Sequence, residues 1–487
     1  MLVNHIIIVS SFLPFATEFR FVSFHSVSFT GQPVRFLVDS SPLPPQRYSP
    51  ESSQHNMKLT ARSFGVWIAV AAIVPTSRVV TRVDAFSAPT VDPTVALKYN
   101  ANAAAAMRRA PVKNVAVPGL ENGMDYVQLG DSDLVVSKVC MGTMTFGEQN
   151  TLEEGVEQLT KAWDTYGVNF VDTAEMYPVP TKAATQGQTD KAVARFLKTR
   201  GDRADVILAT KVSGRAQHIT WLPRGAEPGT TPELSRSQIL QSVDASLERL
   251  ETDYIDLLQL HWPDRYIGGF FGSPDFSPSS YEKAPTPIEF EETMGALQEL
   301  VKAGKVRYIG VSNETPYGVC TMAQMAHQFP DLFPKIVSIQ NSYSLVVRKD
   351  FEAGLAEACY HHNVGLLPYS PLAGGSLTGK YRERDSIPDN ARLKQFPGFM
   401  DRYLDSLNEK AVNKYCDLAM KHGMSPTELA LSWCYHNEKV ASTIIGATSM
   451  VQLDENIKAY DIRLTEDVHK EIAEIYKEFT DPTKARN

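Results

Sequence analysis

The sequence predicts an α/β fold, a (β/α)8 or TIM barrel, over residues 122–480. From about Gly119 onward, short apolar runs alternate with segments of helical periodicity, and eight such pairs follow one another along the chain. Eight strands that are each followed by a helix are what this barrel requires. A doubly wound parallel sheet is the alternative, but it usually has a GxGxxG turn after its first strand, which this sequence lacks.

The strands of the predicted barrel are short apolar runs, and amphipathic helices fill the gaps between them. The predicted strands are Leu134–Cys140, Val168–Asp172, Asp205–Lys211, Ile255–His261, Val306–Ser312, Lys335–Gln340, Val364–Tyr369 and Val440–Gly446. The predicted helices are 152–166, 189–200, 235–251, 288–303, 316–328, 349–362, 408–422 with 425–436, and 449–457. An additional strand, Asp125–Leu129, would pair with 134–139 as a β-hairpin that caps the barrel bottom.

Three connections are longer than a minimal barrel needs. They follow the third, fourth and seventh strands, at 213–234, 264–287 and 373–404, and they are rich in glycine, proline and aromatic residues. All three would leave the barrel at the C-terminal ends of its strands. Loops of this length usually carry function, so we expect them to form the walls or the lid of a binding pocket.

Charge and cysteine content exclude several classes of protein. The 487-residue chain has a formal net charge of −8, so it lacks the basic surface that nucleic-acid binding requires. Its five cysteines lie far apart and form no CxxC pair. This spacing argues against a zinc site or a disulfide framework and favours a reducing compartment, so we expect no metal.

The first 121 residues have the composition of targeting segments rather than of a fold. Residues 1–56 show no sustained periodicity, and we expect them to be a non-native, disordered upstream extension, with translation beginning at Met57. Residues 57–85 predict a signal peptide, because Lys58 and Arg62 precede an apolar run, 64–74, that is too short to span a bilayer. The alternative is that this run is a buried strand or helix.

Residues 86–121 are basic, rich in alanine and poor in acids, which is typical of a transit peptide. The junction Asp84-Ala85-Phe86-Ser87-Ala88-Pro89 resembles the cleavage site of bipartite presequences in algae with complex plastids. We therefore expect import into the plastid (chloroplast) stroma and no membrane association of the mature form, with a cytoplasmic location as the alternative.

Polar side chains stand at the C-terminal ends of consecutive predicted strands. Asp172, Lys211 and His261 end the second, third and fourth strands, and Tyr177 follows Asp172 by five residues. Each alone has an ordinary structural explanation, as a cap, a solvated strand end or a core residue. In a barrel, however, the strand ends converge in one funnel, so together they indicate chemistry.

The four side chains suit proton donation to a carbonyl oxygen during hydride transfer. A tyrosine phenol has a pKa of about 10 and is a weak acid at neutral pH. The ammonium of Lys211 would lower the pKa of Tyr177, and the carboxylate of Asp172 would keep the lysine charged. His261 could donate a hydrogen bond to the substrate oxygen and orient it. The sequence thus predicts Tyr177 as a general acid.

Five motifs, in order along the chain, resemble the aldo-keto reductase superfamily. They are Asp172-Thr173-Ala174-Glu175-Met176-Tyr177, Ala209-Thr210-Lys211, Asp256-Leu257-Leu258-Gln259-Leu260-His261, Gly310-Val311-Ser312-Asn313 and Tyr369-Ser370-Pro371-Leu372. Glu175-Met176-Tyr177-Pro178-Val179-Pro180 and His261-Trp262-Pro263-Asp264-Arg265 are most similar to its Tas-type branch. The resemblance runs from about 124 to 478 and implies an NADP(H)-dependent reductase of aldehydes and ketones.

The resemblance also implies a set of cofactor-binding residues. These are Gly142, Thr143 and Met144 beside the nicotinamide ribose; Ser312, Asn313 and Gln340 at the carboxamide; Tyr369 stacked on the nicotinamide; Ser370, Pro371, Leu372, Gly374 and Lys380 at the pyrophosphate; Arg392 as a second cation for the 2′-phosphate; Gly446, Thr448, Gln452, Glu455 and Asn456 at the 2′-phosphate and adenine; and Asp172. The amides that open helix 449–457 could meet an anion directly. Met176, Trp262 and Phe146 are expected to line the substrate pocket.

Other functions are compatible with parts of the sequence. Residues 374–380 have the glycine and lysine spacing of a P-loop, but Tyr381 stands where that motif needs Ser or Thr, which argues against a nucleoside triphosphatase. A barrel aldolase could use Lys211 for a Schiff base. A regulatory subunit like the superfamily's potassium-channel β members could bind NADP(H) with little turnover. We expect a monomer or a weak homo-oligomer whose partner is a small carbonyl compound.

Overall fold

The computed structural model describes residues 112–224, 229–268 and 275–484, and eight parallel strands form its centre. The strands are β4 Val139–Gly142, β5 Phe170–Asp172, β6 Ile207–Val212, β7 Ile255–Leu260, β8 Val306–Ser312, β9 Ile336–Gln340, β10 Gly365–Leu366 and β11 Thr443–Ile445. Their order in the sheet is β10-β9-β8-β7-β6-β5-β4-β11. Leu366 also forms a parallel bridge with Val440, so the two edges of the sheet meet. The predicted barrel is confirmed.

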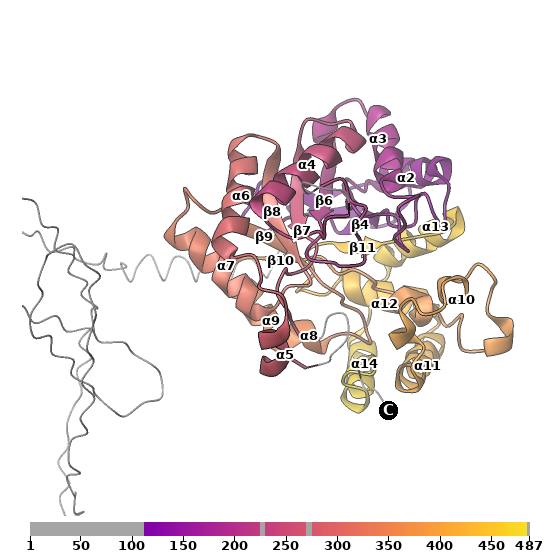
Figure 1. The fold of residues 1–487 in the computed structure, drawn as a ribbon. Helices are drawn as coiled ribbons and strands as arrows, with labels where there is room; N and C mark the ends of the chain where they lie inside the picture. The colour runs from indigo at the N-terminus through magenta and orange to yellow at the C-terminus, as the bar shows by residue number, and fades with distance from the viewer. Residues whose placement is uncertain (1–111, 225–228, 269–274, 485–487) are drawn as a thin grey trace, which may run out of the picture. The chain divides into compact units, whose positions relative to one another are not determined.

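Helices surround the strands, as Figure 1 shows. They are α2 Leu152–Tyr166, α3 Gln188–Lys198, α4 Arg236–Leu250, α5 Pro278–Lys283, α6 Phe290–Lys302, α7 Pro316–Gln328, α8 Lys349–Glu352, α9 Leu355–His361, α10 Arg392–Gln395, α11 Ser406–Lys421, α12 Pro426–Tyr435, α13 Met450–Lys458 and α14 Glu466–Glu478. Helix starts follow local chemistry. A capping box joins Thr151 to Glu154 at α2, and another joins Ser425 to Glu428 at α12.

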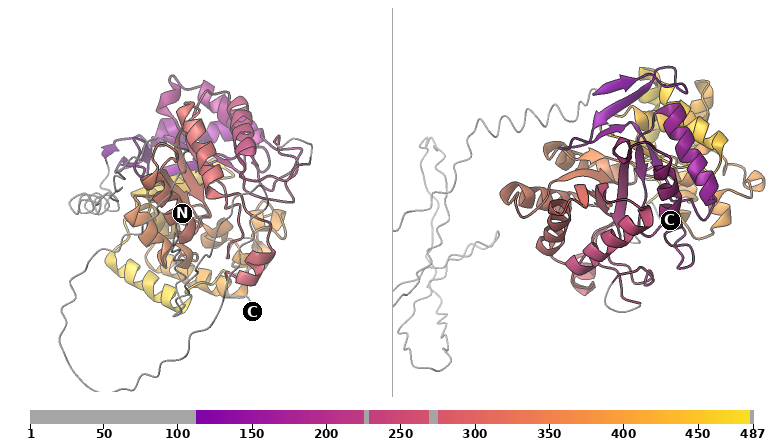
Figure 2. Two further views of the ribbon diagram at one scale, coloured as in Figure 1. Left: turned by 60° about the vertical axis from the view of Figure 1, so that its left-hand side comes forward. Right: turned by 90° about the horizontal axis from the view of Figure 1, so that it is seen from above.

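A small antiparallel sheet closes the N-terminal end of the barrel. It consists of β1 Lys113–Val115, β2 Met124–Gln128 and β3 Val135–Ser137, in that order, and Figure 2 shows it in indigo. Its apolar side chains join those that fill the barrel interior. This interior core contains Val127, Leu129, Leu134, Val136, Cys140, Phe170, Ile207, Ala209, Leu257, Val337, Leu367, Ala441 and Ile444. The small sheet therefore plugs the barrel, as the predicted hairpin would.

The structure differs from the predictions at several elements. The run 134–140 forms two strands, because β3 belongs to the plug and β4 to the barrel. Strand β1 was not predicted; it lies within 86–121, so the folded part of the chain begins before residue 122. The predicted helix 349–362 is two helices, α8 and α9, because Gly354 between them has φ 146°. Helix α14 was also not predicted. The expected upstream extension 1–56, the expected signal peptide 57–85 and residues 86–111 of the expected transit-peptide-like segment lie outside the described residues.

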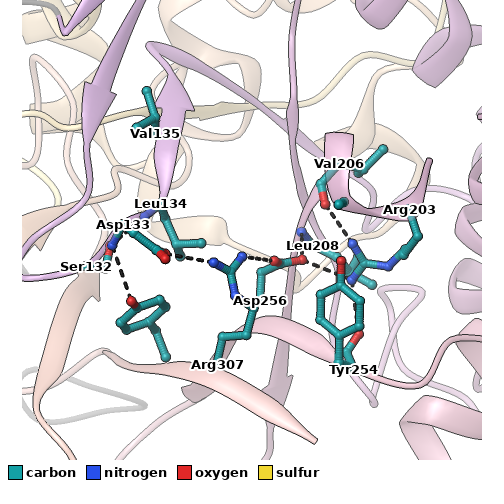
Figure 3. Close-up of polar contacts among 12 residues, drawn as sticks. Ser132, Asp133, Leu134, Val135, Arg203, Val206, Leu208, Tyr254, Asp256 and Arg307 are labelled. Atoms are coloured by element: carbon teal, nitrogen blue, oxygen red, sulfur yellow. Dashed lines mark hydrogen bonds and ion pairs between the residues drawn. The ribbon is translucent and has the colours of Figure 1, made fainter. Parts of the chain in front are cut away.

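Near the N-terminal ends of the strands, one buried carboxylate joins three segments of the chain (Figure 3). Asp256, the second residue of β7, accepts hydrogen bonds from Arg203 Nη2 at 2.9 Å, from Arg307 Nη1 at 2.7 Å and from the Leu208 amide at 3.0 Å. Arg307 also pairs with Asp133, next to β3, at 2.7 Å. The network thus ties β6, β7 and β8 to the plug.

We expect Asp256→Ala to lower the free energy of unfolding by about 2–3 kcal/mol, because it removes the acceptor of the buried Leu208 amide and one carboxylate partner from each of Arg203 and Arg307. Chemical denaturation would measure the change. Asp133→Ala is the matched control: its side chain is 69% exposed, so the loss should stay below about 1 kcal/mol. Equal losses from the two variants would contradict this account of the network.

Candidate active site

The four side chains that the sequence placed at strand ends lie together at the C-terminal end of the barrel. Asp172 is the last residue of β5, Lys211 lies near the end of β6, and His261 directly follows β7. Lys211 Nζ donates to Asp172 Oδ2 at 2.5 Å and to the Thr173 carbonyl at 2.9 Å. The same ammonium lies 3.4 Å from Tyr177 Oη.

His261 completes the group from the neighbouring strand. The Tyr177 and His261 rings meet edge to face, with their centroids 5.9 Å apart. Burial lowers the pKa of His261 well below its ordinary value, and the charge of Lys211 lowers it further. The imidazole is therefore neutral at pH 7. Its Nδ1 is buried and has no hydrogen-bond partner among the described residues, and His261 lines the cavity described below, where the ring could bind a polar ligand atom.

The electrostatics of Tyr177 differ from the expectation in one respect. Burial raises the pKa of Tyr177 above its ordinary value; the Lys211 ammonium opposes this rise without overcoming it, and the Asp172 carboxylate adds to it. Burial alone would lower the pKa of Lys211, but Asp172 and Tyr177 raise it, so its net direction is upward. Tyr177 therefore keeps its proton at neutral pH, and the fixed cation beside it stabilises the phenolate that proton donation would create.

A residue that sequence reasoning missed holds Asp172 in place. Gln259 Nε2 donates to Asp172 Oδ1 at 3.0 Å, and Gln340 Nε2 donates to the same oxygen at 2.8 Å. Gln259 lies on β7, two residues before His261, and therefore faces the same side of the strand. A single amide inside the apolar run Leu257–Leu260 was the sequence signal that could have found it.

A cavity of about 570 Å³ opens above these residues. It contains most of the predicted cofactor and substrate residues. They are Gly142, Thr143, Met144, Asp172, Met176, Tyr177, His261, Trp262, Ser312, Asn313, Gln340, Tyr369, Ser370, Pro371, Leu372, Gly374, Lys380, Arg392, Gly446, Thr448, Gln452, Glu455 and Asn456. Residues that the sequence did not single out also line it, among them Gln149, Val179, Phe399, Met400 and Arg402.

Two predicted residues do not line the cavity. Lys211 is buried behind Asp172 and Tyr177, where it acts through both of them. Phe146 was expected in the substrate pocket, and this prediction is wrong. Its ring is fully buried in the core that packs α2 and α3 against the barrel, close to Gly155, and its carbonyl accepts a hydrogen bond from Thr189. The sequence could not show towards which side of the loop this ring turns.

The part of the cavity next to His261 has a fixed pattern of amides and hydroxyls. Asn313 Nδ2 donates to the His261 carbonyl at 2.9 Å, and Tyr369 Oη donates to Asn313 Oδ1 at 2.7 Å. Ser312 Oγ donates to the Gln340 carbonyl at 2.7 Å. Asn313 has φ 54°, in the left-handed region that asparagine tolerates better than most residues. These bonds hold the carboxamide-binding residues expected from the sequence at the ends of β8, β9 and β10.

Farther along the cavity, two cations lie beside a glycine turn. Gly374 and Gly375 have φ 65° and 95°, which explains glycine at both positions. Burial lowers the pKa of Lys380, as does the charge of Arg392, and burial lowers the pKa of Arg392 as well. Within the described residues, neither cation has a carboxylate at ion-pair distance. Desolvated cations without a counter-ion fit the phosphates of a dinucleotide.

The last group of predicted cofactor residues surrounds the start of α13. The Thr448 amide and hydroxyl both donate to Gln452 Oε1, at 3.0 and 3.1 Å, and Asn456 Nδ2 donates to the Gly446 carbonyl at 3.1 Å. The expectation of free amides at this helix start needs one correction. The backbone N–H of Gln452 already donates to the hydroxyl of the N-cap residue Ser449, so this N–H is not available to an anion.

Two of the long loops are joined beside Trp262, which lines the cavity. Asp264 accepts from Arg215 Nη2 at 3.0 Å, from the Leu234 amide at 3.0 Å and from the Ile288 amide at 3.2 Å. The Trp262 indole donates to the Arg215 carbonyl at 3.1 Å. This arrangement fixes Trp262 in the pocket wall. Of the three long loops predicted to form pocket walls, 373–404 lines the cavity directly, whereas the described parts of 213–234 and 264–287 contribute no lining residue and contact the cavity wall through Trp262.

Two features are absent from residues 112–224, 229–268 and 275–484. No three side chains of His, Cys, Asp or Glu gather there into a metal-binding group. No helix in this part of the chain is long and apolar enough to cross a membrane.

Comparison with known proteins gives a consistent result. The Aldo/keto reductase family model matches residues 138–477. The protein tas of Escherichia coli (strain K12) is 43% identical over 361 residues, which cover 74% of this chain and 99% of that protein. An aldo-keto reductase of Babesia bovis is 39% identical over 289 residues (57% and 98%). A probable voltage-gated potassium channel subunit beta of Arabidopsis thaliana is 33% identical over 344 residues (70% and 92%).

Proposed function

Since the chain belongs to the aldo/keto reductase family, we propose that it reduces small aldehydes or ketones to alcohols with NADPH, and that Tyr177 is the general acid. One observation carries the proposal. Tyr177 lines the cavity, and its hydroxyl lies 3.4 Å from a buried lysine that is itself paired with Asp172. This is the arrangement in which a phenol can give up a proton and be stabilised as it does so.

The residues divide the work as follows. NADPH, when bound, supplies the hydride that is added to the carbonyl carbon. Tyr177 donates its proton to the carbonyl oxygen, and the Lys211 ammonium stabilises the phenolate that remains. Asp172 keeps Lys211 charged and in position. Neutral His261, edge to face with Tyr177, orients the carbonyl oxygen by a hydrogen bond.

The cavity also supports the choice of cofactor. Ser312, Asn313 and Gln340 would hold the carboxamide, and the Tyr369 ring would stack on the nicotinamide. Lys380 and Arg392, which lack counter-ions among the described residues, would neutralise the phosphates. The assay that tests the proposal measures NADPH oxidation by the purified protein with a panel of aldehydes and ketones. No turnover with any of them would contradict it.

Arg392 gives a test of the preference for NADPH. We expect Arg392→Ala to weaken NADPH binding about 10- to 100-fold and NADH binding little, because a charged hydrogen bond to the 2′-phosphate is lost. Fluorescence titration with the two cofactors would measure both affinities. The control is Arg382→Ala, since Arg382 pairs with Asp417 outside the cavity and should leave both affinities unchanged. A parallel loss for NADH would place Arg392 elsewhere than at the 2′-phosphate.

A second candidate follows from the similarity to the Arabidopsis thaliana protein named as a probable channel subunit beta. The chain could bind NADP(H) as a regulatory subunit and turn it over only slowly. The joint presence of Tyr177, Lys211, Asp172 and His261 around one cavity favours the reductase. Tight NADPH binding without turnover, together with co-purification of a membrane channel, would favour the regulatory subunit.

A further inference from the structure

Asp172, Gln259 and Gln340 form a closed triangle of hydrogen bonds inside the top of the barrel. Both glutamine nitrogens donate to Asp172 Oδ1, at 3.0 and 2.8 Å, and Gln340 Nε2 also donates to Gln259 Oε1 at 3.0 Å. The three residues lie on β5, β7 and β9, and as whole residues they are 2%, 0% and 3% exposed. Because the three residues are buried, their donors and acceptors are satisfied mainly by one another.

The charge of Asp172 determines the direction of every bond in the triangle. A carboxylate can only accept, so each glutamine must turn its nitrogen towards Asp172. Gln259 then has its oxygen left to accept the second proton of Gln340 Nε2. With both amide protons used, Gln340 has its carbonyl oxygen Oε1 left over. Gln340 lines the cavity, so the group it can offer there is an acceptor.

We propose that Gln259 is a positioning residue that locks the Gln340 amide with its oxygen towards the cavity, so that the site selects a cofactor whose ring substituent donates N–H. The inference rests on the proposed function, since the carboxamide of NADP(H) is such a substituent. Gln259 does not line the cavity, so it would touch neither substrate nor cofactor. It acts through Gln340 and through Asp172, which links it to Lys211.

Without Gln259, two buried groups lose their partners. One proton of Gln340 Nε2 would have no acceptor, and Asp172 Oδ1 would lose a donor. An unpaired buried group is costly, so the Gln340 side chain would turn to find another partner and its oxygen would no longer be held towards the cavity. The loss should therefore appear in how the cofactor's carboxamide is recognised.

The test compares NADP⁺ with its 3-acetylpyridine analogue, in which a methyl ketone replaces the carboxamide and no N–H is available. We expect the wild-type protein to bind NADP⁺ about tenfold more tightly than the analogue, which is the effect of about one good hydrogen bond. Gln259→Met keeps the length of the side chain and removes both polar atoms. We expect it to reduce this preference to less than about threefold, mainly through weaker NADP⁺ binding.

Gln259→Glu provides the conservative rescue. A protonated glutamic acid can donate its O–H to Asp172 and accept from Gln340, so at low pH this variant should regain the wild-type preference for NADP⁺. As its carboxyl ionises, it repels Asp172, and the preference should fall. The other titratable groups around the triangle are Lys211 on β6, Cys140 on β4, Tyr177 and His261; all of them are present in the wild-type protein, whose titration serves as the reference.

Ser338→Ala is the matched control for packing. Ser338 lies on β9 two residues before Gln340, is fully buried and has a hydroxyl without a partner among the described residues. It should leave the preference unchanged. An unchanged preference in Gln259→Met would overturn the inference, as would a Gln259→Glu variant whose preference shows no pH dependence beyond that of the wild type. A wild-type protein that fails to bind NADP⁺ at all would instead refute the proposed function, and the inference with it.

Discussion

Tyr177→Phe should lower kcat for carbonyl reduction by about 10³-fold while leaving the dissociation constant for NADPH unchanged within about twofold. The substitution removes one oxygen atom, the proton donor that lies 3.4 Å from Lys211 Nζ. The lost interaction develops in the transition state, where the proton moves to the carbonyl oxygen, so the rate falls and ground-state binding of the cofactor does not. Steady-state kinetics and a fluorescence titration measure the two quantities.

Tyr343→Phe is the matched control for removing a buried tyrosine hydroxyl. Tyr343 Oη donates to Glu352 at 2.6 Å, away from the residues that line the cavity. We expect this variant to retain its kcat and to lose stability instead. A Tyr177→Phe variant that lost NADPH affinity as strongly as turnover would contradict the role of Tyr177 as the acid and would make it a binding residue.

Lys211→Met should produce the second large effect, in both rate and stability. The side chains of Lys211 and Asp172 are 0% and 3% exposed, so removing the cation leaves a carboxylate buried without its charge partner. We expect a loss of about 3 kcal/mol in the free energy of unfolding and a fall in kcat of about 10²-fold or more, because the phenolate of Tyr177 loses its stabilising charge. Denaturant unfolding and steady-state kinetics would test the two effects separately.

The difference in unfolding free energy between the wild-type protein and Lys211→Met should depend on pH in a defined direction. The pKa of Lys211 is raised above its ordinary value in the folded protein, mainly by Asp172 and Tyr177 acting against burial. The stabilisation it provides is therefore fully present at neutral pH and up to the pKa of the unfolded lysine, and it is lost as the pH rises through the higher folded value. The wild-type protein and Lys211→Met should thus converge in stability only in strongly alkaline solution.

A surface lysine gives the comparison for Lys211→Met. Lys161 pairs with Asp454 at 2.6 Å, but the two side chains are 31% and 30% exposed. Because water screens this pair, Lys161→Met should cost less than about 1 kcal/mol and should leave kcat unchanged. If Lys211→Met were as mild as Lys161→Met, the buried pair would not support the acid as proposed.

The sequence was sufficient to predict those site residues whose role depends only on their position at the end of a strand. Asp172, Lys211 and His261 each end an apolar run, and parallel strands bring such ends together in a barrel, so their convergence followed from the order of elements. The fold class followed from the same alternation of apolar runs and helices. The sequence did not predict how deeply a side chain is buried or towards which side of its loop it turns. The ring of Phe146 turns into the core, and the net pKa of Tyr177 depends on burial that no sequence pattern displays.

Two other features, Gln259 and strand β1, were not predicted from the sequence. The amide of Gln259 interrupts a run of buried apolar residues and could have marked it, but nothing in the sequence shows that its partner is Gln340, which lies far away in the chain. Strand β1 is three exposed residues long and owes its conformation to pairing with β2 rather than to its own composition. The role of Gln259 and the conformation of β1 both depend on tertiary contacts, which cannot be predicted from the sequence of one segment alone.

The bridge that Asp264 makes between the loops after β6 and β7 has a consequence for how new specificities could arise in this barrel. The carboxylate holds Arg215 and the Leu234 amide of one loop and the Ile288 amide of the other. Replacing the loop after β6 alone with that of a related barrel would remove two of these three contacts, those of Arg215 and the Leu234 amide, and would disturb the Arg215 carbonyl that anchors Trp262. The two loops therefore depend on each other. A graft or a recombination event should preserve the pocket wall when both loops are transferred together.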